Sequence, residues 1–130
     1  MTILCIDYGE RKLGIAISRG FLAEPIAVLQ NVSSSSVVEK LRGIVDREEV
    51  SEILVGLAEG TVADAQQRFG EDLQHAVNVP VKFVDETLST KDAQAKAIEA
   101  GIPQKKRHEM EDAYAAAIIL QNYLESQAGV

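Results

Sequence analysis

Acidic side chains stand at three places where regular elements are expected to begin or end. Asp7 lies at the end of one apolar strand, the pair Asp85-Glu86 stands at the end of another, and Asp112 falls in the first turns of a late helix. Successive strand side chains point to opposite faces, so only one of Asp85 and Glu86 can join Asp7, and alternation alone does not choose. Two unit charges ~4 Å apart repel by roughly 4 kcal/mol at an effective dielectric of about 20. Three converging carboxylates therefore indicate a bound cation, and ligation by oxygen alone suits Mg²⁺ or Mn²⁺.

Basic side chains lie close to these acids in the sequence and are candidates for phosphate contact. Arg11 and Lys12 occupy the turn after the first strand, and Lys105-Lys106-Arg107 precedes the last helix. Cations near a helix N-terminus oppose its dipole by ~0.3–1 kcal/mol each, so helix stability does not explain this run. The net charge of −7 disfavours a broad nucleic-acid surface, because affinity for polyanions comes chiefly from Lys and Arg. Phosphate binding would therefore be local, and we assign Gln66 and Arg68 to the solvated surface.

Hydrophobic periodicity predicts the elements that must position these groups. Five apolar runs have the character of strands: Thr2–Tyr8, Lys12–Ser18, Ala27–Val32, Glu52–Leu57 and Val79–Val84. Four segments have helical spacing: Ser36 to about Arg47, Thr61 to about Val77, Ser89 to about Gly101, and about Glu109 to Ser126. Ser36 and Glu39 have the spacing of a capping box, which places the start of the first helix there. Residues 127–130 are expected to fray.

This order of elements predicts an α/β fold in one domain over residues 1–126. Three adjacent strands form an antiparallel meander, and the later strands alternate with helices, which implies a mixed five-stranded sheet flanked by helices. Ligands in such sheets gather where strand ends meet at a switch point. The alanines that follow Asp112 would let the last helix approach the sheet closely, although helix propensity alone explains them equally well.

Composition excludes several classes of protein. No apolar run approaches the ~18 residues that a membrane span requires, and the chain opens without the features of a secretory signal, so we expect a cytoplasmic protein. Cys5 stands alone among apolar neighbours, which indicates a buried core thiol rather than a nucleophile. His75 and His108 lack the clustered partners of a zinc site.

Four motifs follow one another along almost the whole chain: IDYGERKLGIAIS, ILVGL, FVDETLST and EDAYAAAIILQNYL. In this order they resemble the YqgF/RuvX family, the Holliday-junction-resolvase-like pre-16S rRNA nucleases of the RNase H-like superfamily. The resemblance implies an RNase H-like fold. It also implies catalytic and metal-binding acids at Asp7, Glu86 and Asp112, and so favours Glu86 over Asp85.

The chemistry that this resemblance implies is phosphodiester hydrolysis by two Mg²⁺ or Mn²⁺ ions ~3.5–4 Å apart. Asp7 would bridge the ions, while Glu86 and Asp112 would each hold one. The substrate would be pre-16S rRNA during ribosome biogenesis, cut by a monomer or a homodimer. The residues expected to contact its phosphates are Arg11, Lys12, Lys105, Lys106 and Arg107.

The sequence departs from the family pattern at three places. Thr87 stands where an Arg is usual, which removes a guanidinium that could bind phosphate bidentately. The central loop contains Ala58-Glu59 in place of the usual Pro-containing segment, and Glu59 is a rival candidate for a metal ligand. Arg19 replaces an acid after the second strand. None of these changes removes a proposed metal ligand.

Three other functions compete with the nuclease. A noncatalytic RNA-binding factor of ribosome assembly could retain the acids as a structural Mg²⁺ site. A junction resolvase would act on branched DNA and would require a dimer that presents two active sites. An actin-like kinase or ATPase begins with a similar hairpin but needs two such domains, which a chain of 130 residues does not offer.

Overall fold

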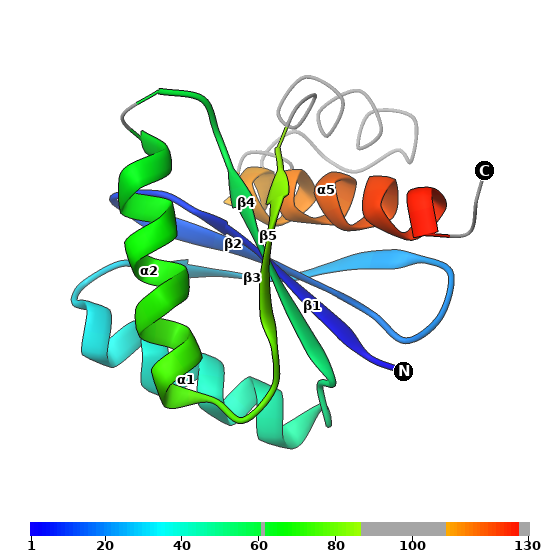
Figure 1. Cartoon of the computed structure of the whole chain (residues 1–130), viewed down its shortest axis with the longest axis horizontal. Helices are drawn as coiled ribbons and strands as arrows, with labels where there is room; N and C mark the ends of the chain where they lie inside the picture. Colours follow the sequence, from blue (N-terminus) through cyan, green and yellow to red (C-terminus); the bar gives the residue numbers. More distant parts are fainter. Residues whose placement is uncertain (61, 87–108, 128–130) are drawn as a thin grey trace.

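A computed structural model of the chain describes residues 1–60, 62–86 and 109–127. Its elements follow one another as β1 (Ile3–Tyr8), β2 (Lys12–Ser18), β3 (Ala23–Gln30), α1 (Ser34–Arg47), β4 (Glu52–Leu57), α2 (Val62–Ala76), β5 (Val81–Asp85) and α5 (Glu111–Gln127) (Figure 1). The helix predicted from Ser89 to about Gly101 lies outside the described residues, as do residues 128–130 of the predicted frayed end.

The five strands form one mixed sheet in the order β3-β2-β1-β4-β5. β1 pairs with β2 and β2 with β3 in antiparallel fashion, while β4 runs parallel to β1 and β5 parallel to β4. The predicted meander and mixed sheet are confirmed. Because β1, β4 and β5 are parallel, their carboxyl ends lie at one edge of the sheet, where β2 begins.

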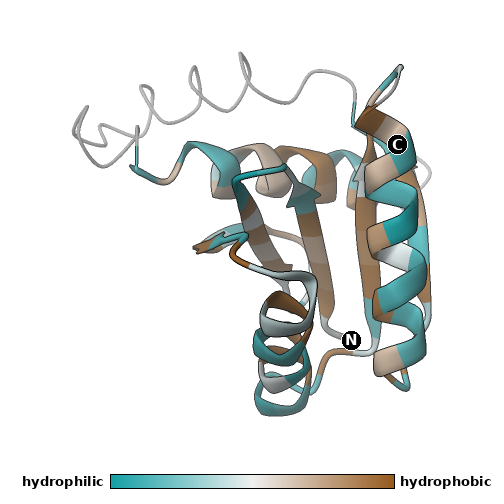
Figure 2. Cartoon of the chain, turned by 90° about the vertical axis from the view of Figure 1, so that its left-hand side faces the viewer, coloured by the Kyte–Doolittle hydropathy of each residue, from teal (hydrophilic) through white to brown (hydrophobic). Residues whose placement is uncertain are grey.

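Helices cover both faces of the sheet, with α1 and α2 on one face and α5 on the other (Figure 1). Alternation along each strand divides the core between these faces: in β1, Leu4 and Ile6 pack with α1 and α2, whereas Ile3 and Cys5 pack with α5. In Figure 2 the strands are mostly hydrophobic, while the helices also carry hydrophilic residues. Cys5 is fully buried, as predicted.

The third strand begins earlier than the sequence predicts. β3 starts at Ala23 instead of Ala27 and includes Pro25, which lies opposite Ala16 where the register shifts. Proline cannot donate to a ladder, but an edge strand leaves one row of its backbone groups unpaired, and a bulge relieves the pairing locally. β3 is the edge strand beyond β2, so Pro25 does not end it.

The first helix also begins earlier than predicted, at Ser34 instead of Ser36. Ser33 is the N-cap, and its hydroxyl oxygen accepts a hydrogen bond from the Ser36 backbone N–H at 3.2 Å. Each serine of this run could cap the helix. With Ser33 as the cap, Val37 and Leu41 face the core. None of the helices in the described ranges is long and apolar enough to cross a bilayer.

Helix α5 lies unusually close to β2 at Gly14. A Cβ added to Gly14 would overlap the backbone carbonyl of Asp112, so only glycine fits there. On the same face of the helix, Ala113, Ala116 and Ala117 are buried against the sheet. The small residues predicted to allow a close approach are therefore in contact with the sheet, and Gly14 completes that approach from the other side.

We predict that Gly14→Ala will lower the free energy of unfolding by about 1–3 kcal/mol, because the added methyl group must displace the backbone of α5. Urea denaturation followed by circular dichroism measures the change. Gly43→Ala in α1 is the matched control. A Cβ at Gly43 meets no atom within 4 Å, so alanine should stabilise the protein by up to about 1 kcal/mol. Equal free energies of unfolding for Gly14→Ala and the wild type would contradict this account.

Candidate active site

The pleat of the sheet directs two acids toward α5. Asp7 has the same orientation along β1 as Ile3 and Cys5, which pack against α5, and it lies opposite Gly14 of β2. Glu86 follows β5 by one residue and shares the orientation of Val84, which also packs against α5. Its backbone N–H donates to the Leu57 carbonyl at 3.1 Å, which extends the pairing of β5 with β4 to this position.

Asp7 and Glu86 are in direct contact. The pKa of Asp7 is raised to about 8, first by burial and then by the negative charge of Glu86, a hydrogen bond between the two side chains and the charge of Asp112. Two carboxyl groups can share a hydrogen bond only if one of them holds a proton. Near neutral pH that proton resides on Asp7. Asp85 is exposed and has the opposite orientation on β5.

Asp112 reaches the same place from the first turn of α5. Lys12 Nζ lies 3.3 Å from Asp112 Oδ2, and the two side chains are 42% and 31% exposed. This is an ion pair without hydrogen-bonding geometry, since the buried Oδ2 atom has no hydrogen-bond partner among the described residues. A buried carboxylate oxygen without a donor is an unsatisfied acceptor, which a cation would satisfy.

The chemistry of these donors fits a hard divalent cation. Asp7, Glu86 and Asp112 offer only carboxylate oxygens, which Mg²⁺ and Mn²⁺ prefer. The three acids are spread more widely than a bound ion requires: in the described part of the chain, no three acidic, histidine or cysteine side chains are grouped closely enough to hold one. The shared proton and the Lys12 ammonium instead offset their charges.

Gly56 of β4 leaves room for Glu86. A Cβ there would lie 3.0 Å from Glu86 Oε2 and 3.1 Å from Ile119 Cδ1, which is tighter than most real contacts. β4, which lies between β1 and β5, thus has no side chain at Gly56. Glu86 can occupy that space, and its carboxyl group can reach Asp7 across β4.

The prediction that Gln66 belongs to the solvated surface is wrong. Its side chain is 1% exposed, donates from Nε2 to Glu86 Oε2 at 3.1 Å, and belongs to the site. A signal is present in the sequence. Gln66 lies four residues after Val62 and three before Phe69, which places it on the apolar face of α2 where a polar residue is unexpected.

The turn between β1 and β2 brings two predicted phosphate contacts to the edge where the acids lie. Gly9 N–H donates to the Lys12 carbonyl at 3.1 Å, and Asn31 fastens the turn through its side chain to Gly9 O and its backbone to Arg11 O. Arg11 is exposed, whereas Lys12 is paired with Asp112. Lys105, Lys106, Arg107 and Thr87 lie outside the described residues.

Arg19 and Glu59 are two of the departures from the family pattern, and the structure describes both. Arg19 follows the last residue of β2, at the opposite edge of the sheet, and forms an ion pair with Glu48 after α1. It therefore does not contribute charge to the acid site. Glu59 is exposed in the loop between β4 and α2.

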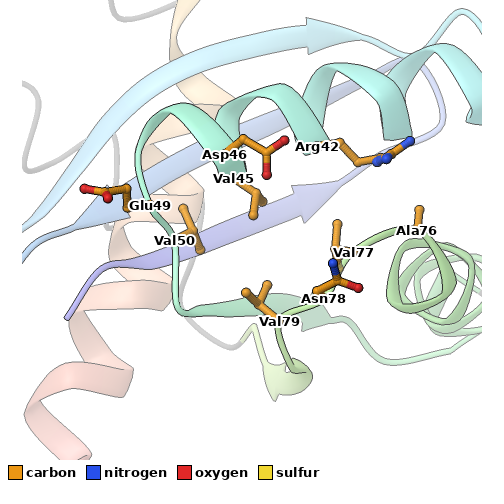
Figure 3. A pocket seen from close by; sticks show the side chains of 9 residues that line it. All are labelled: Arg42, Val45, Asp46, Glu49, Val50, Ala76, Val77, Asn78 and Val79. Atoms are coloured by element: carbon orange, nitrogen blue, oxygen red, sulfur yellow. The ribbon is translucent and has the colours of Figure 1, made fainter.

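A cavity of about 430 Å³ lies at that opposite edge, between the ends of α1 and α2 (Figure 3). Its floor is apolar, with Val45, Val50, Val77 and Val79 among the lining residues, and Glu49 points away from the others. The acids whose charges interact lie at the other end of the sheet, so we place the candidate active site there and not in this cavity.

The raised pKa of Asp7 predicts a pH-dependent stability. Between about pH 4 and pH 8 the folded protein keeps a proton on Asp7 that the unfolded chain releases, so the contribution of Asp7 to stability is largest at low pH and is lost as the pH rises toward 8. We expect the metal-free wild type to lose on the order of a few kcal/mol across this range. Asp7→Asn, which cannot ionise, should show a flatter profile.

Urea unfolding in the presence of a chelator at pH 5, 6, 7 and 8 measures both profiles. The difference in free energy of unfolding between Asp7→Asn and the wild type should grow in favour of the variant with increasing pH. A difference that stays constant from pH 5 to pH 8 would show that Asp7 is ionised throughout.

Comparison with known proteins places this arrangement in a family. The family model described as "RuvX: Holliday junction resolvase" matches residues 1–126. Proteins named "Putative pre-16S rRNA nuclease" from Halothermothrix orenii and Thermoanaerobacter pseudethanolicus are each 38% identical to this chain, covering 98% of it and 96% and 98% of their own lengths.

Solved structures agree on the fold. Thermus thermophilus RuvC in complex with a Holliday junction superposes with a TM-score of 0.63 at 15% identity, covering 99% of this chain and 96% of its own. The Fowlpox virus resolvase in complex with junction DNA gives 0.65 at 15% identity, with 98% and 99% covered. The sheet and helices thus form an RNase H-like fold of the RuvC type, and the chain belongs to the RuvX family.

Proposed function

We propose that this protein is a metal-dependent nuclease that hydrolyses phosphodiester bonds in pre-16S rRNA. The observation that carries the proposal is the contact of Asp7 with Glu86 beside an Asp112 oxygen that lacks a hydrogen-bond donor among the described residues. Carboxylate oxygens at one end of the sheet are the donors that a hard divalent cation prefers. The substrate is suggested by the relatives named as pre-16S rRNA nucleases. A cytoplasmic location is part of the proposal, because the processing of rRNA takes place where ribosomes are assembled.

Asp7, Glu86 and Asp112 would hold one or two Mg²⁺ or Mn²⁺ ions. Bound there, such ions activate water and stabilise the leaving oxygen in phosphodiester hydrolysis. Before an ion can bind, the proton on Asp7 must leave and Lys12 must release Asp112. Lys12 would then be free to contact a phosphate beside the acids.

Arg11 is the described residue best placed for a further phosphate contact, because it is exposed at the tip of the β1–β2 turn. We propose that Lys105, Lys106 and Arg107, which precede α5 in the sequence, also contact phosphates of the RNA. With a net charge of −7 opposing the RNA, binding should depend on these few cations and should weaken as salt is raised.

One observation favours a second candidate function, a noncatalytic RNA-binding factor. The ion pair of Lys12 with Asp112 neutralises an acid that an active nuclease would use for metal binding. Such a factor would bind the same RNA without cutting it. A resolvase acting on branched DNA as a homodimer would use the same acids on a different substrate.

The test is cleavage of a labelled pre-16S rRNA leader by the purified protein with Mg²⁺ or Mn²⁺. We expect metal-dependent cleavage by the wild type. Changing even an indirect partner of a metal ligand lowers activity ~10–100-fold, so Asp7→Asn and Glu86→Gln should each lose at least about 100-fold. Asp112→Asn should fall by a comparable factor.

Asp46→Asn is the control, because Asp46 is an exposed carboxylate near the end of α1, at the edge of the sheet away from the acids. It should cleave at the wild-type rate. RNA binding without cleavage by the wild type would favour the assembly factor. Cleavage of a four-way DNA junction in preference to the leader would favour the resolvase.

A further inference from the structure

Gln66 makes three hydrogen bonds with the ends of three neighbouring strands. Its Oε1 accepts from the backbone N–H of Ala58, just after β4, at 2.7 Å. Its Nε2 donates to the carbonyl of Tyr8, the last residue of β1, at 3.3 Å and to Glu86 Oε2, just after β5, at 3.1 Å. A single amide group thus joins the carboxyl ends of β1, β4 and β5.

The backbone partners fix which way the amide faces. Ala58 N–H can only donate, so it requires Oε1, and the Tyr8 carbonyl can only accept, so it requires Nε2. Rotating the amide by half a turn would break both bonds. Nε2 must therefore face Glu86. Its orientation is set by the two backbone partners and not by Glu86, so the amide always presents an N–H donor to that carboxyl group.

The helix that carries Gln66 is held against the same strand end. Phe69, three residues later, stacks on Tyr8 with ring centroids 4.4 Å apart and an interplanar angle of 27°. Phe69 is 3% exposed and packs in the core. The helix that carries Gln66 is thus held at the end of β1 by the stacking of Phe69 on Tyr8, and the Gln66 amide is held by three hydrogen bonds.

We propose that Gln66 is a positioning residue that holds the Glu86 carboxylate in place for a divalent cation, an inference that rests on the proposed function. Gly56 bounds Glu86 from β4, and Gln66 bounds it from α2. Buried hydrogen-bond partners of metal ligands orient the ligand and raise the affinity for the ion. Gln66 would thus act through Glu86 without touching the ion or the RNA.

The chain contains a matched control for a purely structural role. Gln74, two turns further along α2, accepts from Val81 N–H at 2.8 Å and donates to the Val79 carbonyl at 3.0 Å. It joins α2 to the start of β5 through the same two kinds of backbone bond, at the opposite end of that strand from Glu86. Both of these bonds go to backbone groups, so Gln74 lacks the bond to the Glu86 carboxylate. Gln74 also differs from Gln66 in being exposed, so Gln74→Met controls for the loss of backbone hydrogen bonds and not for burial.

The experiment compares Gln66→Met with Gln74→Met, since methionine keeps the length of glutamine and removes its hydrogen bonds. Calorimetric titration with Mg²⁺ alone, without RNA, measures metal affinity independently of cleavage. We expect Gln66→Met to bind Mg²⁺ about 10- to 100-fold more weakly than the wild type and Gln74→Met to bind within about twofold of it. Wild-type affinity in Gln66→Met, or an equal loss in both variants, would overturn the proposal.

A second measurement needs no variant and decides the matter if Gln66→Met does not fold. In nuclear magnetic resonance spectra of the wild type, titration with Mg²⁺ should shift the side-chain amide resonances of Gln66 and leave those of Gln74 unchanged. Unchanged Gln66 resonances at saturating Mg²⁺ would overturn the proposal. If Mg²⁺ shifts the Gln66 amide resonances but the leader RNA is not cleaved, the proposed nuclease function fails while the proposed role of Gln66 is supported.

Discussion

The close contact between Gly14 and the backbone of Asp112 is the constraint on which the rest of the site depends. It brings the first turn of α5 against β2 directly opposite Asp7, because Asp7 and Gly14 are paired across the strands. A side chain at position 14 would push α5 away from β2, and Asp112 would move with the helix. The alanines of α5 continue the contact along β2, β1 and β4, so the same packing that buries this face of the sheet also sets the third acid.

Electrostatics then determines what the assembled site can do. The pleat of β1 and β5 and the approach of α5 place three acids at one edge, and the protein without metal offsets their charge with a proton on Asp7 and an ion pair from Lys12. Both compensations are reversible: a proton leaves as the pH rises, and a half-exposed lysine can turn to solvent or to a phosphate. Under the proposed function the site can therefore exchange this proton and this ion pair for a divalent cation and an RNA phosphate.

Local patterns in the sequence are sufficient for most of the fold. Apolar runs locate all five strands, and the pairing of three adjacent strands follows from short connections. Alternation restricts Asp85 and Glu86 to opposite faces but does not say which face α5 covers, since that depends on packing between distant elements. Pro25 and the serine run mislead because an edge strand tolerates proline and because several serines could cap the same helix. Thr87 and the basic run before α5 stay predictions.

Gln66 shows why sequence reasoning finds the acids and misses what holds one of them. An acid is conspicuous because its charge needs a partner wherever it is buried, whereas a glutamine is neutral and common on helix surfaces. The contacts of Gln66 depend on tertiary structure: the ends of β1, β4 and β5 must lie together before the Tyr8 carbonyl, the Ala58 N–H and the Glu86 carboxylate are within reach of one amide. The two kinds of support also differ physically. The Glu86 carboxylate accepts a directional hydrogen bond from Gln66 on α2, and its backbone pairs with β4. Asp112 is placed by the close fit of α5 on Gly14 and by its ion pair with Lys12. If the site binds metal as proposed, Asp112 and Lys12 are the groups that must rearrange, and Glu86 is the fixed point around which they do so.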